Sequence, residues 1–181
     1  MLFRSSLEFR DMPFTGNKYI ESLRNKPELK IIFVCLANIS QANKDNFKPE
    51  LKIIFVCLGN ICRSPMAAAI MTKKVESITK PTIVIESAGT SAWHVGEGPN
   101  PQSKKAWEAA GYKYEHVASQ FNKARLKGAV LILAMDQENL QNILNLSDDP
   151  DDVRKIFLIR DFEPGAGEGS EVPDQIGRAH V

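Results

Sequence analysis

This sequence has few cysteines, little net charge and no long apolar run, and each of these features excludes a class of protein. Three cysteines in 181 residues are too few for a disulfide scaffold, which favours a reducing compartment and predicts a cytoplasmic location. The 23 Lys and Arg residues nearly balance the 22 Asp and Glu residues, so we expect neither nucleic acid nor a membrane as a partner. No apolar stretch approaches the roughly 20 residues of a membrane-spanning helix, and the N-terminus lacks the apolar core of a secretory signal.

The most informative segment that is present runs from Cys57 to Pro65 and reads Cys-Leu-Gly-Asn-Ile-Cys-Arg-Ser-Pro. An apolar run over 51–56 precedes it and a helix-like stretch follows it. A thiol at the end of a buried strand, a short loop and a helix N-terminus together form a cradle for a phosphate dianion. Arg63 can bind two phosphate oxygens at once, and the same positive field favours the thiolate of Cys57. We therefore predict that Cys57 is a nucleophile.

Strand-like and helix-like segments alternate after this motif. Helices are expected to begin at the Ser64-Pro65 pair, with Ser64 as the N-cap, and at the cap Asp136. Alternation of this kind predicts an α/β fold with a parallel sheet covered by helices on both faces. Ligands of such folds bind at the carboxyl ends of the strands, where Cys57 is expected to lie. Apolar runs predict strands over 51–56, 81–88, 129–135 and 155–159, and a further helix is predicted over 101–110.

An internal repeat precedes the motif. Residues 26–36 recur as residues 48–58, an offset of 22 residues, and the copies diverge after a few more positions. Two copies of one strand do not make the repeated units of a solenoid. We interpret residues 1–47 as an N-terminal extension that carries a duplicated, inactive first strand. The repeat is either a tandem duplication or an error in gene assembly, and the sequence leaves both open.

The first copy of the repeat lacks the chemistry of the second. Cys35 corresponds to the predicted nucleophile, but Gln41 stands where Arg63 stands, so a phosphate would have no bidentate partner. Ala37 replaces Gly59, at a position where we expect the loop to need a backbone conformation that only glycine adopts. Only the second copy is therefore expected to be catalytic.

The nine-residue motif in its strand–loop–helix setting resembles the active-site loop of the low-molecular-weight protein tyrosine phosphatases, and the resemblance extends over residues 48–174. It implies a three-layer, flavodoxin-like α/β fold with a four-stranded parallel sheet, here without the family's C-terminal helix. It implies a phosphatase domain over 48–175 that hydrolyses phosphotyrosine, in a protein or a small aryl phosphate, through a phosphocysteine intermediate. No cofactor and no metal are expected, because Arg63 and the loop amides supply the positive field.

The resemblance also implies roles for single residues. Arg63 would hold the phosphate and Trp93 would form a wall against the substrate ring. The Ser64 hydroxyl would donate to the thiolate. His116 and Ser87 would fix the shape of the loop without transferring protons. The phosphate-binding loop would consist of Leu58, Gly59, Asn60, Ile61, Cys62 and Ser64.

The resemblance further implies that Asp174 is the general acid. It closes a glycine-rich, acidic loop after the fourth predicted strand, and a phenolate needs a proton to leave. The family carries a proline after this aspartate, whereas Gln175 stands here. Residues 176–181 match the translation of a common sequencing adapter, so we expect them to be a non-native tail. The truncated form is expected to be an impaired catalyst.

Three other functions remain open at the level of the sequence. A protein arginine phosphatase of the same fold is one, but the arginine-directed relatives look to carry a threonine where Ile61 stands, which favours phosphotyrosine. An arsenate reductase is another; it uses a thiol at this loop but in its thioredoxin-linked form needs further cysteines, and none follows Cys62. The third is an inactive phosphate-binding pseudoenzyme, disabled by the duplication and the truncation.

Overall fold

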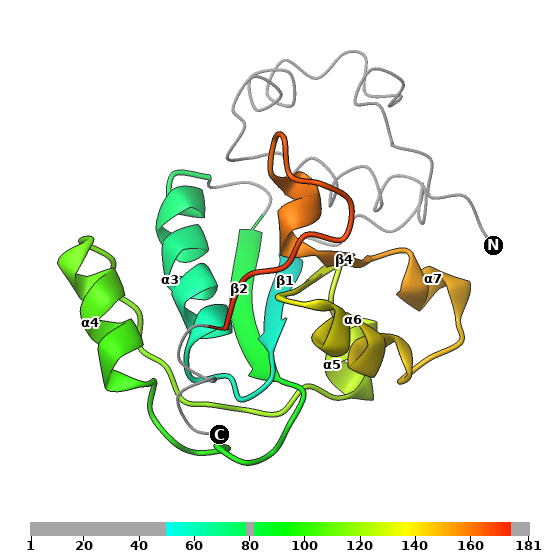
Figure 1. The fold of residues 1–181 in the computed structure, drawn as a ribbon, viewed down its shortest axis with the longest axis horizontal. Helices are drawn as coiled ribbons and strands as arrows, with labels where there is room; N and C mark the ends of the chain where they lie inside the picture. Colours follow the sequence, from blue (N-terminus) through cyan, green and yellow to red (C-terminus); the bar gives the residue numbers. More distant parts are fainter. Residues whose placement is uncertain (1–49, 79–81, 175–181) are drawn as a thin grey trace. The chain divides into compact units, whose positions relative to one another are not determined.

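The computed structural model describes residues 50–78 and 82–174. The duplicated strand, the extension and the proposed tail lie outside the described residues. Four parallel strands form one sheet in the order β2-β1-β3-β4, which confirms the predicted α/β class (Figure 1). The strands are β1 (Glu50–Cys57), β2 (Thr82–Gly89), β3 (Leu131–Ala134) and β4 (Ile156–Leu158).

The central strand β1 is buried on both of its faces. Side chains alternate along a strand, so Ile53 and Phe55 point to one face of the sheet while Ile54 and Val56 point to the other. All four are at most 1% exposed. A strand buried in this way must be apolar throughout, which explains why residues 51–56 form an unbroken apolar run.

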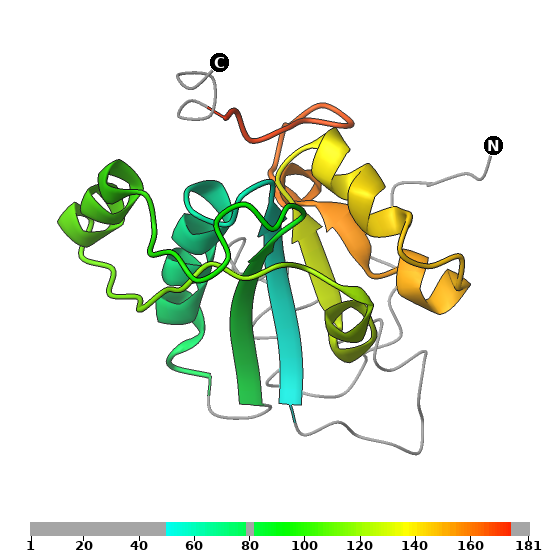
Figure 2. The same ribbon diagram turned by 90° about the horizontal axis from the view of Figure 1, so that it is seen from below.

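Helices cover the sheet on both faces, as Figure 2 shows. The amphipathic helix α3 packs on β1 and β2 through its small apolar residues Ala68 and Ala69, both fully buried. The opposite face packs against α5 and α6 through Leu126 and Ile143. The helices are α3 (Arg63–Val75), α4 (Pro101–Ala109), α5 (Lys123–Gly128), α6 (Gln137–Leu144), α7 (Pro150–Val153) and the 3₁₀ helix η2 (Ile159–Phe162).

Two of the three predicted helix starts agree with the structure, those at residue 101 and after Asp136. Asn100 caps α4, Gly111 follows it with a φ of +83°, and Asp136 caps α6 by accepting from the Asn139 N–H at 2.7 Å. The expectation for Ser64 is wrong. Helix α3 begins at Arg63, and its N-cap position makes no side-chain cap hydrogen bond. No helix among the described residues is long and apolar enough to cross a membrane.

The order of the strands places the motif at a switch point. From β1 the chain passes through α3 to β2 on one side, and β3 lies on the other side of β1. The carboxyl end of β1 is therefore the point where the connections diverge, which is where open α/β sheets bind ligands. After η2 no further helix follows within the described residues. The chain instead runs to the N-terminal end of α3, where Figure 1 shows the red segment ending.

Candidate active site

Cys57 is the last residue of β1 and its side chain is almost fully enclosed, at 3% exposure. Its Sγ lies 3.0 Å from the Ser64 Oγ and accepts a hydrogen bond from the Asn60 N–H at 3.3 Å. The Ser64 hydroxyl is therefore hydrogen-bonded to the thiol and does not cap α3. A hydroxyl and an amide directed at the sulfur stabilise a thiolate better than a neutral thiol.

Asn60 holds the loop together from its centre. It is 1% exposed and has a φ of +56°, a conformation that asparagine tolerates better than most side chains. Its Nδ2 donates to the hydroxyls of Ser64 and Ser87, both at 2.9 Å, and its Oδ1 accepts from the Ser119 N–H at 2.9 Å. The bonds to Ser87 and Ser119 connect the loop to β2 and to the segment before α5, and the bond to Ser64 connects it to α3.

Two glycines at this site lie close to other atoms. The expectation that Gly59 needs a glycine-only conformation is wrong, because the positive φ belongs to Asn60. A Cβ at position 59 would instead meet Cδ2 of His94 at 2.9 Å. At Gly89 the approach is tighter, since a Cβ there would lie 2.7 Å from the Leu58 carbonyl oxygen. Both glycines let neighbouring segments lie directly against the loop.

His116 lies against the loop from outside, as the resemblance implied. Its Nε2 is 2.6 Å from the Asn60 carbonyl oxygen, and because a carbonyl only accepts, Nε2 must carry the proton. Burial lowers the pKa of His116, although the bond to the Asn60 carbonyl opposes the shift. The neutral imidazole is therefore the form that fits this site at neutral pH. The ring of Tyr114 stacks on it with a centroid separation of 6.0 Å.

Arg63 lies at the start of α3 between two carboxylates. Its Nη1 is 2.6 Å from Oδ2 of Asp136, and its Nη2 is 3.0 Å from Oδ2 of Asp174. Nη1 also donates to the Val172 carbonyl at 3.2 Å. The sequence pattern predicted Asp136 as a helix cap, and the resemblance implied that its segment supports the loop from behind. The structure adds that its second oxygen orients Arg63, whose side chain is 10% exposed.

Asp174, the predicted general acid, lies beside Arg63 with a side chain that is 32% exposed. The segment before it is held in place by three hydrogen bonds. The Val172 N–H donates to the Met135 carbonyl at 2.8 Å, and the Gln137 N–H donates to Oε1 of Glu171 at 2.9 Å. Arg160 Nη1 donates to the Glu171 carbonyl at 3.0 Å. A carboxylate at the mouth of a phosphate site, half open to water, is suited to deliver a proton to a leaving group.

Three further predicted residues, Trp93, Ile61 and Cys62, lie in the loop or on a segment that is hydrogen-bonded to it. Trp93, 74% exposed, lies in the segment after β2, where the Ser91 N–H donates to the Leu58 carbonyl at 2.9 Å. The Ile61 carbonyl accepts from the Asn100 N–H at 2.8 Å. Burial raises the pKa of the Cys62 thiol, and the negative groups beside it add to the shift.

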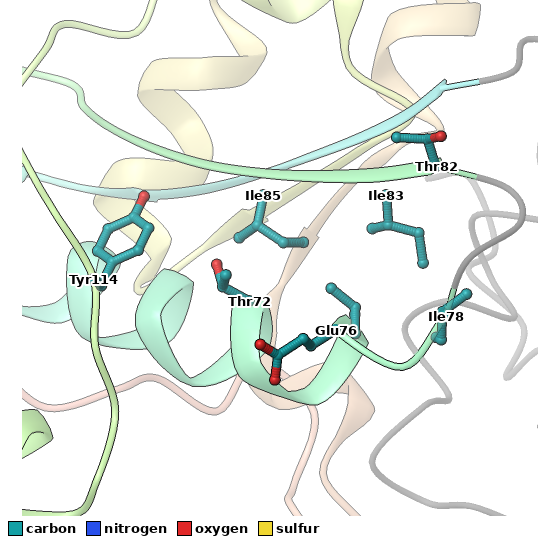
Figure 3. Close-up of a pocket in the computed structure, with 8 residues that line it drawn as sticks. Thr72, Glu76, Ile78, Thr82, Ile83, Ile85 and Tyr114 are labelled. Carbon is teal, nitrogen blue, oxygen red and sulfur yellow. The ribbon is translucent and has the colours of Figure 1, made fainter.

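A separate cavity of about 380 Å³ lies between α3 and β2 (Figure 3). It is lined mainly by aliphatic side chains, and its one charged residue, Glu76, is paired with Lys73 at 2.5 Å. No cysteine, lysine or arginine lines it, so it offers no thiol and no cation for a phosphate and is not the candidate site. Nowhere in 50–78 and 82–174 do three His, Cys, Asp or Glu residues gather as metal ligands would.

Comparison with known proteins gives consistent matches. A family model described as Low molecular weight phosphotyrosine protein phosphatase matches residues 52–180, a range that includes part of the segment interpreted above as a non-native tail. A low molecular weight protein-tyrosine-phosphatase of Streptomyces coelicolor is 38% identical over 115 residues, which are 62% of this chain and 70% of that protein.

Solved structures with the same arrangement include both tyrosine and arginine phosphatases. The crystal structure of a protein tyrosine phosphatase from Entamoeba histolytica, with Hepes in its active site, is similar with a TM-score of 0.63 and 33% identity, over 68% of this chain and 79% of that one. An arginine phosphatase from Geobacillus stearothermophilus is similar with a TM-score of 0.60 and 30% identity, over 70% of this chain and 77% of that one.

Proposed function

The chain belongs to the low molecular weight phosphotyrosine protein phosphatase family, and on this basis we propose that it hydrolyses phosphotyrosine in proteins at the Cys57 site. It is a phosphoric monoester hydrolase by family. The observation that carries the proposal is the convergence of a shielded thiol, a loop of backbone N–H groups and Arg63 at one end of β1. We also propose a cytoplasmic location, because a catalytic thiol needs a reducing compartment.

The first half of the reaction transfers the phosphoryl group to sulfur. Loop N–H groups, the N-terminus of α3 and Arg63 hold the equatorial oxygens of the phosphate in line with Cys57. Sγ attacks phosphorus, a sulfur–phosphorus bond forms and the bond from phosphorus to the phenolic oxygen breaks. Asp174 gives its proton to that oxygen, so tyrosine leaves as a neutral phenol.

The second half regenerates the enzyme. Asp174, now a carboxylate, takes a proton from a water molecule, and the water oxygen attacks phosphorus as the sulfur–phosphorus bond breaks. Inorganic phosphate is released, and Cys57 leaves as a thiolate that the Ser64 hydroxyl and the Asn60 N–H stabilise. Asp136 takes no proton in this scheme; it keeps Arg63 oriented.

Turnover of para-nitrophenyl phosphate by the purified full chain tests the proposal. The Cys57→Ser variant should lose all measurable turnover, because a serine hydroxyl at this site is a far weaker nucleophile. Cys35→Ser, at the corresponding position of the first repeat copy, is the matched control and should retain the activity. Equal losses in both variants, or no activity in the unchanged chain, would contradict the proposal.

Arginine phosphatase activity is the second candidate, and the arginine phosphatase among the similar structures is what favours it. The residue at position 61, here Ile61, distinguishes the two candidate substrates, phosphotyrosine and phosphoarginine. Its aliphatic side chain offers no hydrogen-bond partner to a guanidinium, whereas a threonine would, so it supports phosphotyrosine as the substrate. Ile61→Thr should shift the ratio of kcat/KM toward phosphoarginine. A preference for phosphoarginine in the unchanged chain would contradict the assignment to phosphotyrosine.

A further inference from the structure

Within the described residues, all the exposed large hydrophobic side chains lie on two segments beside the Cys57 site. Trp93 is 74% exposed, Val95 is 54% exposed and Val117 is 65% exposed, while every other large hydrophobic side chain in 50–78 and 82–174 is buried or half-buried. We call these three residues the rim patch. Apolar surface that is confined to one place on a protein usually marks an interaction site.

The rim patch is continuous with the active site through the backbone. The segment that carries Trp93 lies along the loop, because the Thr90 N–H donates to the Cys57 carbonyl at 2.9 Å. The segment that carries Val117 lies along it through His116 and its bond to Asn60.

The two segments are also bonded to each other. The Gly96 N–H donates to the Ala118 carbonyl at 2.9 Å, and the Ala118 N–H donates to the Glu97 carbonyl at 2.8 Å. Val95 and Val117 therefore project from one joined surface whose inner edge is the phosphate loop.

We infer that Val95 and Val117 bind an apolar residue that flanks the phosphorylated residue in a peptide segment of the protein substrate. The inference rests on the proposed function, since it concerns the substrate of the same site. Trp93 is assigned to the phosphorylated ring, so the two valines are left for a residue next to it in the peptide. Consecutive residues of an extended chain are only about 3.8 Å apart, so a flanking side chain must lie on the rim when the phosphate is bound.

The charges around the rim patch favour an apolar partner over an acidic one. Glu97 follows Val95 on the same segment with a side chain that is 59% exposed, and it pairs with His94 at 2.8 Å. Glu115, also exposed, comes two residues before Val117. Two carboxylates beside the valines disfavour an acidic flanking residue by like-charge repulsion.

Three phosphotyrosine peptides that differ only in the flanking residues test the inference. The flanking residues are leucine in one peptide, serine in the second and glutamate in the third. The reference substrate is para-nitrophenyl phosphate, which has no flanking residues. The unchanged chain should prefer the leucine peptide and should be slowest on the glutamate peptide. The Val95→Ser, Val117→Ser double variant should lose on the order of tenfold in kcat/KM on the leucine peptide alone. Lys105→Ser, at an exposed position on α4, is the control and should change none of these values.

The possible outcomes distinguish a failure of this inference from a failure of the proposed function on which it rests. Equal kcat/KM values for the leucine and serine peptides, with normal turnover of para-nitrophenyl phosphate, would overturn only the inference. Absence of turnover on every substrate would overturn the proposed function and this inference with it. Sedimentation of the unchanged chain as a dimer that the double variant dissociates would identify a second copy of the chain as the occupant of the rim patch, and would also overturn the inference.

Discussion

The Nη2 of Arg63 and the Oδ2 of Asp174 lie 3.0 Å apart, so the proposed phosphate-binding residue is already paired with the proposed general acid. A phosphate that enters the site must share or replace this contact. The two proposed roles of the site are therefore coupled before any substrate binds, and one substitution at position 174 should change both of them in opposite directions.

Replacement of Asp174 by asparagine should slow the chemistry and strengthen the binding of phosphate. We expect kcat on phosphotyrosine to fall by roughly 10²–10⁴-fold, because the phenolate loses its proton donor. Aryl phosphates with acidic leaving groups should be affected much less. The inhibition constant of inorganic phosphate should fall, because Arg63 loses an anionic competitor. Steady-state kinetics measure both effects, with Asp148→Asn, an exposed carboxylate away from these contacts, as the control. Equal losses across leaving groups would show that Asp174 is not the acid.

The Gly89→Ala substitution should disrupt the loop at Leu58. The new Cβ would meet the Leu58 carbonyl oxygen at 2.7 Å, and backbone cannot move aside as a flexible side chain would. Overpacking of this kind costs about 1–3 kcal/mol of stability, and displacement of the loop should also reduce kcat. Gly128→Ala is the matched control, because its Cβ would meet no atom within 4 Å. Urea unfolding and turnover compare the two variants, and similar behaviour would contradict the steric account.

Burial of His116 should make stability depend on pH below neutrality. The folded-state pKa of His116 is lowered by burial, so the unfolded chain takes up a proton at a higher pH than the folded protein does. As the pH falls through about 6.5, the unfolded state binds more protons at this residue and stability falls until the folded pKa is reached. The stability difference between the unchanged chain and His116→Gln should therefore shrink between pH 7.5 and pH 5.5. Parallel curves of unfolding free energy against pH would argue against a lowered pKa.

Cys62 should protect Cys57 from irreversible oxidation. Burial raises the pKa of Cys62, which keeps it a thiol while the thiolate of Cys57 is oxidised first. Peroxide would convert Cys57 to a sulfenic acid, and the Cys62 sulfur would then displace water to form a disulfide. Mild peroxide should inactivate the chain reversibly and give a Cys57–Cys62 crosslink in a peptide map. Cys62→Ser should make the loss permanent, whereas Cys35→Ser should not; permanent loss in the unchanged chain would refute the idea.

The sequence was most informative where chemistry and local pattern coincide. Cys57 and Arg63 belong to one short motif, and β1 is apolar because it is buried on both faces, so both were predictable. The short helices α5 and α7 were not predicted, because a few residues carry too little periodicity. The placement of Ser64 was wrong for a physical reason. A serine before a proline resembles a helix cap, but in the folded site the hydroxyl lies against the thiol, where the family resemblance had placed it, and does not cap the helix.

Contacts between segments that are distant in the sequence could not be predicted from local sequence patterns. Asp136 follows a strand and precedes a helix, so its capping oxygen was predictable. The partner of its other oxygen lies 73 positions earlier, and nothing in the neighbourhood of Asp136 indicates it. Glycine adopts a positive φ most easily, so the local pattern points to Gly59, whereas the native loop has its positive φ at Asn60.

The two oxygens of Asp136 connect the first turn of a helix to Arg63, the residue proposed to bind phosphate. One accepts from the Asn139 N–H in the first turn of α6, and the other holds Nη1 of Arg63. Fraying of that turn would therefore release the arginine while the sheet stayed intact. Amide hydrogen exchange at Asn139 and loss of activity on gentle warming should then report the same local opening, so the enzyme should lose its function below the temperature at which it melts.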